Sequence, residues 1–558
     1  MGKSVGHKSF LGAALAAVLL FPGCGGSENS FVRTGSGTVL SGASPVAQND
    51  SFNAIGNATL NQAATGVLAN DTPNGATISA FDSTGSRSGT LVLNQDGSFA
   101  YTPATGFIGT ETFNYTLGGS AGLSTATITF TSTGKAVFVD NTAAAGGNGS
   151  QSAPFNNLAA AVVAASSGDT IFVSRGDGTT QGLTGAVNLP SGVDLVGEGA
   201  GLILAQTVVP AGTAPVITGP INCGGNNEIK GFTISGASGN ALSANGVSNI
   251  TVENNTITNP GARSILFTNV GGTVNIVSNT FSSPANDNED WIQLNNNNSN
   301  ATFTVTDNTF QNSPIQNTED LCQMELTGTS VTTCNFSRNR ATSDTADSFD
   351  FGLFLSLEDT AQVTATVADN MFKGFESVPL ELCPADSGTV LQATVSGNTI
   401  ENVSGDNGIA VDGANGLITI SGNTLTNISD DGIDIDGFGF GGSYIVESNT
   451  VTGAGDDGID YEGTPGADTV ALRIRSNIVT NSASDAIDVD TAATSGTLCV
   501  DLSGNIVDRD IDIDNFGGGT VQVEQLSTLS SVNTLNSGAM IGTNTGTVTE
   551  VPDGTCIF

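Results

Sequence analysis

The most constraining feature of the chain is a short phrase, Asn-Thr followed by an apolar residue or a close variant, which recurs ten times at intervals of 24 to 31 residues. The phrase changes little from copy to copy, whereas the number of residues between copies varies. A period of this size with variable spacing indicates stacked coils joined by loops of different lengths. The asparagines that mark the phrase are Asn255, Asn279, Asn308, Asn339, Asn370, Asn398, Asn423, Asn449, Asn477 and Asn505.

Apolar and polar residues alternate on both sides of each asparagine. In most copies the fifth and third residues before it are apolar, as Ile418 and Ile420 are before Asn423, and so is the second residue after it. Alternation at period two around a fixed polar residue indicates short strands separated by a tight bend. We expect the asparagines to take the left-handed torsions of that bend and to hydrogen-bond up one column. This ladder would contain Asn398, Asn423, Asn449, Asn477 and Asn505.

These repeats resemble those of the right-handed parallel β-helix (pectin-lyase-like) superfamily, over about residues 135–525. The phrases Val137-Phe-Val-Asp140, Ala153-Pro-Phe155 and Gly168-Asp-Thr-Ile-Phe-Val173 resemble the capping helix and first strand of such proteins. The resemblance implies an all-β fold, with residues 526–558 as a C-terminal cap or tail. It says little about function, because function resides in sites rather than in folds.

A different unit occupies residues 45–131. Its short alternating runs, separated by Gly, Asn, Asp and Pro, indicate a small antiparallel β-sandwich. The phrases Val67-Leu-Ala-Asn-Asp71 and Asp96-Gly-Ser-Phe-Ala-Tyr-Thr-Pro103 resemble those of bacterial cadherin-like or immunoglobulin-like modules. Such modules usually serve as spacers or adhesive units. We expect a break in strand structure at residues 132–135, with independent folding on either side.

Residues 1–24 are predicted to be an export signal. Two lysines precede an apolar run at residues 10–21 that is too short to span a bilayer. The run ends at Phe21-Pro22-Gly23-Cys24, which resembles a bacterial lipobox, although Phe21 and Pro22 depart from its pattern. Cys24 would then carry the lipid that holds the protein on a membrane, and residues 25–44 would be a linker. Ordinary cleavage nearby is the alternative. Lipidation predicts a cell-surface or outer-membrane lipoprotein, and cleavage predicts a secreted protein.

The remaining cysteines are even in number and widely scattered. In an exported protein they are compatible with three disulfides, and buried free thiols are the alternative. Their spacing does not match that of a metal site such as Cys-x-x-Cys. These residues are Cys223, Cys322, Cys334, Cys383, Cys499 and Cys556.

The chain is strongly acidic. It carries 53 Asp and Glu against 14 Lys and Arg, for a formal net charge of −39. Nucleic acids and anionic lipids are therefore poor partners, and cations are good ones.

Acidic residues concentrate in four late coils, each with isoleucines between its acids. With the isoleucines pointing inward, the acids form two outward columns. Within a column, the acids of neighbouring coils lie about 4.8 Å apart. Like charges at this spacing repel, and Ca²⁺ suits carboxylate oxygens held at flexible separations. A solvated acidic face that keeps the stack soluble is the alternative. The candidate Ca²⁺ ligands are Asp431, Asp434, Asp436, Asp457, Asp460, Glu462, Asp485, Asp488, Asp490, Asp512 and Asp514.

The residues bear on two enzymatic functions. Polysaccharide hydrolases of the superfamily carry a Gly-His-Gly motif, whereas the only histidine here is His7, inside the predicted signal. A calcium-dependent lyase would need a basic residue, for which Arg473 and Arg475 are candidates. Plain ion pairs to neighbouring coils also explain both arginines, and we favour that explanation. The lone tryptophan, Trp291, could stack on a sugar or lie buried.

The sequence thus predicts an exported surface protein whose calcium-rich β-helix binds a polysaccharide or extracellular matrix without catalysis. A calcium-dependent lyase acting on an acidic polysaccharide is the alternative. Contact with a membrane would be through the lipid alone.

Overall fold

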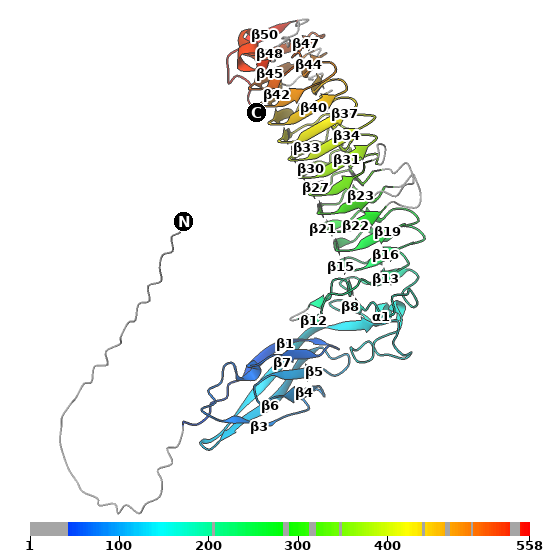
Figure 1. Ribbon diagram of the computed structural model, residues 1–558, viewed down its shortest axis with the longest axis vertical. Coiled ribbons are helices and arrows are strands. Elements are labelled where there is room, and N and C mark those ends of the chain that lie inside the picture. Colours follow the sequence, from blue (N-terminus) through cyan, green and yellow to red (C-terminus); the bar gives the residue numbers. More distant parts are fainter. Residues whose placement is uncertain are drawn as a thin grey trace, which may run out of the picture.

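The computed structural model describes residues 43–203, 207–282, 290–311, 320–344, 349–437, 441–463, 469–492, 495–535 and 547–558. The predicted export signal with Cys24 and almost all of the predicted linker lie outside these residues. The described chain is a long stack of β-coils with a small β-unit at its N-terminal end (Figure 1). Within the described residues, no helix is long and apolar enough to cross a membrane.

Each coil contributes a strand to three parallel sheets that run the length of the stack. Sheet 1 precedes the repeated asparagine in each coil. Its strands are β8 (Thr170–Val173), β10 (Asp194–Gly197), β15 (Asn227–Lys230), β18 (Ser248–Glu253), β21 (Gly271–Val277), β24 (Ala301–Thr306), β27 (Val331–Ser337), β30 (Gln362–Ala368), β33 (Val390–Ser396), β36 (Leu417–Ser421), β39 (Ser443–Glu447), β42 (Thr469–Arg475), β45 (Thr497–Ser503), β48 (Thr520–Glu524) and β50 (Val548–Val551).

Sheet 2 follows the asparagine. Its strands are β13 (Val216–Ile217), β16 (Thr233–Ser235), β19 (Thr256–Thr258), β22 (Thr280–Ser282), β25 (Thr309–Gln311), β28 (Arg340–Thr342), β31 (Met371–Phe375), β34 (Thr399–Val403), β37 (Thr424–Ile428), β40 (Thr450–Ala454), β43 (Ile478–Thr480), β46 (Ile506–Val507) and β49 (Thr534–Leu535).

Sheet 3 carries the acidic residues. Its strands are β9 (Val187–Leu189), β14 (Ile221–Cys223), β17 (Leu242–Asn245), β20 (Ile265–Thr268), β23 (Ile292–Asn297), β26 (Cys322–Thr327), β29 (Leu353–Leu357), β32 (Leu380–Pro384), β35 (Ile409–Val411), β38 (Ile433–Asp436), β41 (Ile459–Gly463), β44 (Ile487–Thr491) and β47 (Asp514–Asn515). A two-stranded hairpin of β11 (Leu202–Ile203) and β12 (Thr207–Val209) lies beside the first coils.

The inward residues of the three sheets form one continuous apolar core from Val137 to Leu529. Ile418 and Ile420 on β36 and Leu425 on β37 are fully buried, as the alternation around Asn423 predicts. At the N-terminal end, α1 (Leu158–Ala164) covers the core with Leu158 and Ala161, and its N-cap Asn157 accepts a hydrogen bond from Ala160. A helix here closes an open end that would otherwise expose apolar residues and strand edges. The predicted parallel β-helix with an N-terminal cap is confirmed.

The asparagines form a single buried column, as predicted. The backbone N–H of each one donates to the side-chain oxygen of the next, at 2.9 to 3.1 Å, from Asn255 up to Asn533. Each amide nitrogen also donates to a backbone carbonyl of the coil below, as Asn423 does to Val395 at 3.0 Å. The ladder extends one coil further than the sequence phrases indicate, because Asn533 ends it.

The expected left-handed torsion does not lie at the ladder asparagine. It lies at the residue before it, for example Ser448 (φ 59°) before Asn449 and Ser476 (φ 57°) before Asn477. Glycine fills this position at Gly397, Gly422 and Gly504, which suits its freedom at positive φ. The asparagine is therefore specified by its hydrogen bonds and not by its own backbone conformation.

The N-terminal unit consists of two packed sheets. One contains β1 (Asp50–Gly56), β3 (Thr77–Phe81), β6 (Gly109–Gly119) and β7 (Gly122–Val139); the other contains β2 (Leu60–Gln62), β4 (Thr90–Leu93) and β5 (Phe99–Thr102), with the short η1 (Gly66–Leu68) beside it. Phe113, Tyr101 and Phe130 pack in its separate core. The predicted small sandwich is confirmed.

The expected break at residues 132–135 is absent from the structure. Strand β7 pairs with β1 and β6 in the sandwich and continues without interruption to pair with β8 of the first coil (Figure 1). Phe138 and Phe172 pack in an apolar cluster shared by both units, and Lys135 forms an ion pair with the buried Asp169. The sequence reasoning missed the continuation because Gly134 and Lys135 interrupt the apolar alternation.

One disulfide, Cys499–Cys556, joins β45 to the C-terminal tail. Cys223, Cys322 and Cys334 are buried free thiols and Cys383 is a half-buried one. The three-disulfide expectation is therefore wrong, and the alternative of buried thiols is correct for three of the cysteines. The short η2 (Leu526–Thr528) and α2 (Leu529–Val532) cover the last coils, with Leu529 in the core.

Candidate cation site

The two predicted acidic columns have the predicted register on the outer face of sheet 3. Asp434, Asp460 and Asp488 are aligned in neighbouring strands, and the bridge between Ile487 and Ile511 places Asp512 next. The intervening Ile433, Ile459 and Ile487 are fully buried. The second column is Asp436, Glu462, Asp490 and Asp514.

The first column is more enclosed than an ordinary surface strip of carboxylates. Burial, reinforced by the charges of Asp431 and Asp434, raises the pKa of Asp460 to about 9. Burial likewise raises the pKa of Asp434 to about 8 and that of Asp488 to about 7, with neighbouring carboxylates adding to both. At neutral pH these groups need protons or a cation. Burial also raises the pKa of Asp490 to about 6, and raises those of Asp436 and Asp512.

A third set of acids forms a ladder at the bend before each strand. The carboxylate of Asp431 accepts the backbone N–H of Asp457 at 2.7 Å, and that of Asp457 accepts the N–H of Asp485 at 2.5 Å. Asn407 fills the same position one coil earlier, where its side-chain oxygen accepts the N–H of Asp431 at 2.9 Å. These bonds fix the bend carboxylates beside the first column. Burial raises the pKa of Asp431 to about 7 and that of Asp457 to about 6.

The ladder and the first column meet in two groups of three carboxylates. Oxygen atoms of Asp431, Asp434 and Asp460 lie within 4.8 Å of one another, and so do those of Asp457, Asp460 and Asp488. We call these the lower and upper triads. Asp460 belongs to both. Each triad takes a bend residue and a strand residue from one coil and a strand residue from the next, so the stacking of coils builds the site.

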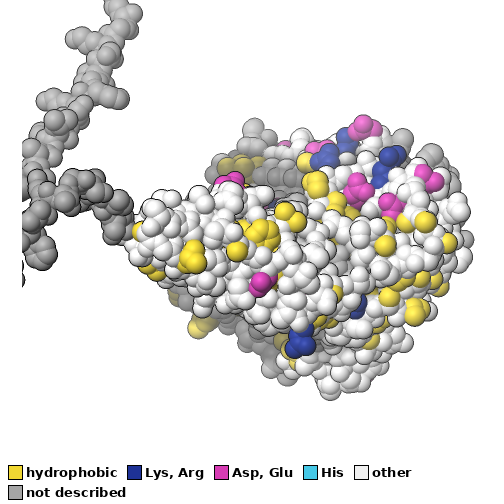
Figure 2. Space-filling view, turned by 90° about the horizontal axis from the view of Figure 1, so that it is seen from below, with side chains coloured by type: hydrophobic (Ala, Val, Ile, Leu, Met, Phe, Trp, Pro, Cys, Tyr) yellow, Lys and Arg dark blue, Asp and Glu magenta, His cyan; other side chains and the backbone are white. Residues whose placement is uncertain are grey.

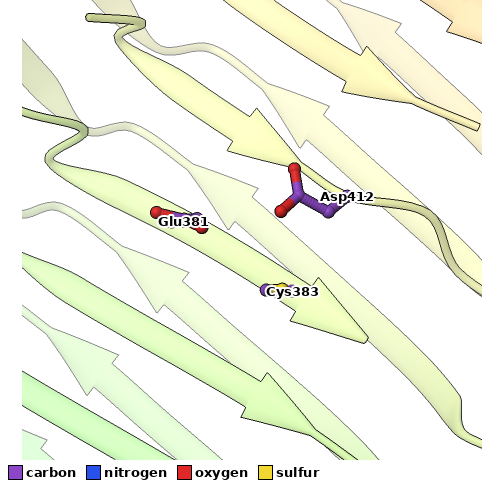
Figure 3. A group of neighbouring side chains, drawn as sticks. All are labelled: Glu381, Cys383 and Asp412. Carbon is purple, nitrogen blue, oxygen red and sulfur yellow. The ribbon is translucent and has the colours of Figure 1, made fainter. Parts of the chain in front are cut away.

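The first column is interrupted in the coil directly below Asp434, and no further triad of the described carboxylates forms there. Below Asp434 the same position holds Ala410, and below that Glu381. Glu381 and Cys383 on β32 and Asp412 after β35 form a mixed group within 4.8 Å (Figure 3). Burial raises the pKa of Glu381 to about 7 and that of the Cys383 thiol to about 12. A further acidic group, Asp430, Asp431 and Asp456, lies on the exposed side of the lower triad.

The charges seen at the other end of the molecule are mixed. Seen from the N-terminal end, the visible surface is mostly uncharged, and most of its acidic side chains lie near basic ones (Figure 2). The triads, by contrast, consist of carboxylates alone.

Arg473 and Arg475 lie on sheet 1, away from the acidic columns of sheet 3. Both pair with the buried Asp501, at 3.2 and 2.5 Å. This is the arrangement expected of structural ion pairs between coils. Trp291 is fully buried beside Phe310 and Phe349, so of its two alternatives burial is correct and stacking on a sugar is not.

Sequence reasoning missed three features of the site. It placed Asp431, Asp457 and Asp485 among the ligands without recognising their ladder, although the phrases Asn407-Gly, Asp431-Gly and Asp457-Gly keep one phase. It also missed Asp412 and Glu381, because neither belongs to a repeated acidic phrase.

Comparison with known proteins matches the N-terminal unit and the β-helix to two different family models. Residues 43–134 match the family model of the bacterial cadherin-like domain. The N-terminal unit is a bacterial cadherin-like domain. Residues 141–348, within the β-helix, match the model of a protein family of unknown function, DUF1565. No curated protein matches the chain in sequence.

Two solved structures share a remote likeness in fold. One is the catalytic unit of a thermostable GH87 α-1,3-glucanase from Streptomyces thermodiastaticus, with a TM-score of 0.35 and 15% identity over 82% of this chain and 76% of that one. The other is the family 28 exopolygalacturonase of Yersinia enterocolitica, with a TM-score of 0.26 and 13% identity over 64% of this chain and 84% of that one. Likenesses at this level carry no argument about activity.

Proposed function

We propose that the chain is an exported, non-catalytic binding protein whose C-terminal coils hold Ca²⁺ and whose β-helix engages a polysaccharide or extracellular matrix. The observation that supports this proposal most strongly is that Asp460 belongs to two carboxylate triads in adjacent coils. Its raised pKa, about 9, reflects the cost of leaving this charge buried among others. A bound divalent cation removes that cost.

The donor set favours Ca²⁺. Both triads consist of carboxylates alone, and hard oxygen donors at adaptable separations suit a large cation with six to eight ligands. Three carboxylates leave several ligand positions for water or for a partner's oxygens. Carboxylates and hydroxyls of an acidic polysaccharide are the same kind of ligand.

The charge of the chain supports cation-dependent binding. With a net charge of −39, the protein repels an acidic polymer unless cations bridge the two. Neutral hydroxyl side chains such as Thr424 and Thr450 stand in register on the outer face of sheet 2 and can hydrogen-bond to sugars. Arg473 and Arg475, the candidates for a lyase base, both form ion pairs with Asp501. This pairing favours binding over catalysis.

Placement outside the cell rests on the predicted export signal at residues 1–24. Lipidation at Cys24 would hold the protein at the surface, with the cadherin-like domain as a spacer, whereas ordinary cleavage would release it.

The test is co-sedimentation of the purified chain with an insoluble acidic polysaccharide, in Ca²⁺ or in a chelator. We expect binding in Ca²⁺ that Asp460→Asn abolishes and Glu325→Gln retains, because Glu325 lies on β26 of the same sheet but in neither triad. Binding that persists in chelator and in the Asp460→Asn variant contradicts the proposal. Release of unsaturated uronate products would contradict it too, in favour of a lyase.

A further inference from the structure

The C-terminal tail folds back over the outside of sheet 1. After β50, the turn at Pro552-Asp553-Gly554-Thr555 reverses the chain, with the Thr555 N–H donating to the Pro552 carbonyl at 3.2 Å and Gly554 at φ 78°. Pro, Asp and Gly are typical of such turns. The tail then passes from the last coil towards earlier ones.

Four contacts fasten the tail to three coils. Cys556 is joined to Cys499 on β45, and its N–H donates to Glu524 on β48 at 2.6 Å. The Phe558 ring lies 4.0 Å from the guanidinium of Arg473 on β42. Asp553 lies 3.9 Å from Arg475 on the same strand.

The tail buries residues that the strand pattern points outward. On β45 and β48 the inward positions are Leu498, Val500 and Val523, so Cys499, Asp501 and Glu524 face out, yet they are 4%, 2% and 3% exposed. Asp501 and Glu524 are carboxylates whose burial is tolerable only with partners. Removing the tail would take from Glu524 the Cys556 N–H that it accepts, and would uncover the two arginines that pair with Asp501.

We infer that the C-terminal tail is a redox-operated clasp: the Cys499–Cys556 disulfide holds it over the last coils, and reduction frees it. A dithiol reductant supplies two electrons and two protons, converting the disulfide to two thiols and becoming a cyclic disulfide itself. The remaining contacts are an exposed ion pair, one ring contact and one hydrogen bond. Without the covalent link the tail depends on these three contacts alone, so the reduced tail opens more often than the oxidised one.

The clasp also acts on the cation sites, an effect that rests on the proposed function. Cys499 lies in the coil that carries Asp488, the last ligand of the upper triad. The lower triad takes its ligands from the two coils before that one. Reduction therefore weakens Ca²⁺ binding at the upper triad and spares the lower triad.

Hydrogen exchange of the full chain, oxidised and reduced, tests the clasp itself. Amides of β48 and β50 should exchange at least about tenfold faster after reduction, while those of β33 and β36 stay unchanged. The double variant Cys499→Ser/Cys556→Ser should exchange at the fast rate with or without reductant. Unchanged protection of β48 and β50 in the reduced protein overturns the inference.

Calcium titration of two single variants tests the coupling. Asp434→Asn retains only the upper triad and Asp488→Asn only the lower one. Reduction should lower the affinity of Asp434→Asn and leave that of Asp488→Asn unchanged; equal responses overturn the coupling. If the oxidised wild type binds no Ca²⁺, the proposed function fails, and hydrogen exchange alone decides whether the clasp exists.

Discussion

Asp460 on β41 lies directly below Asp488 on β44, and both carboxylates converge with that of Asp457 within 4.8 Å. The contact exists only because two coils, 28 residues apart in sequence, stack in register. Because of this stacking, the carboxylates of neighbouring coils interact with one another and are not independent surface charges.

Asp460→Asn should abolish the stabilisation of the protein by Ca²⁺, since Asp460 serves both triads. In the wild type, a hundredfold excess of Ca²⁺ over its Kd should raise the free energy of unfolding of these coils by about 2.7 kcal/mol. Thermal melts with Ca²⁺ or chelator measure the difference. Mg²⁺ should stabilise less, because it demands rigid octahedral geometry.

Glu325→Gln is the matched control, since it removes one carboxylate charge from β26 of the same sheet, outside both triads. It should respond to Ca²⁺ as the wild type does. Equal calcium responses in Asp460→Asn and the wild type would show that the columns are only a solvated acidic face.

In chelator, the protein should lose stability as the pH rises. The pKa values of Asp488, Asp434 and Asp460 in the folded state are about 7, 8 and 9, above the ordinary 3.8. The folded state therefore holds protons that the unfolded chain has released, and the stability they provide is lost as the pH rises through the folded values. Denaturant midpoints measured from pH 5 to 9 should fall in chelator and flatten in Ca²⁺. A midpoint that rises over this range would contradict the burial of these carboxylates.

Asn423→Ala should destabilise the stack by about 3 kcal/mol, because it leaves the N–H of Asn398 and the carbonyl of Val395 unpaired in the core. The neighbouring exposed Thr424 supplies the control, and Thr424→Ala should change the free energy of unfolding by less than about 0.5 kcal/mol. Chemical denaturation of the two variants makes the comparison. Similar losses would show that the ladder adds no specific stability.

The junction between the cadherin-like domain and the β-helix should resist proteolysis, since β7 is paired on both sides of it. Gly134→Ala should weaken it, because a Cβ there would lie 2.2 Å from the Gly168 carbonyl oxygen. A loss of about 1 to 3 kcal/mol is expected, with new cleavage near residue 134. Gly239→Ala, where the added Cβ meets open space, should leave both measurements unchanged. Ready cleavage of the wild type at the junction would contradict the continuous strand.

Periodicity predicted the coils, the asparagine column and the register of the acids, because each depends on a pattern that repeats along the chain. The alternation around Asn423 and the isoleucines beside Asp434 and Asp460 were sufficient for that. The clasp, the continuous β7 and the mixed group of Glu381, Cys383 and Asp412 each occur once. They depend on contacts between distant residues, for which a single sequence carries no repeated signal.

Diffraction from crystals grown in Ca²⁺, with anomalous data to locate the ion, decides whether the triads hold Ca²⁺. We expect one anomalous peak coordinated by Asp431, Asp434 and Asp460 and a second by Asp457, Asp460 and Asp488, and neither peak in crystals of Asp460→Asn. Ordered wild-type triads without a peak, in crystals that bind Ca²⁺ elsewhere or nowhere, would contradict this expectation.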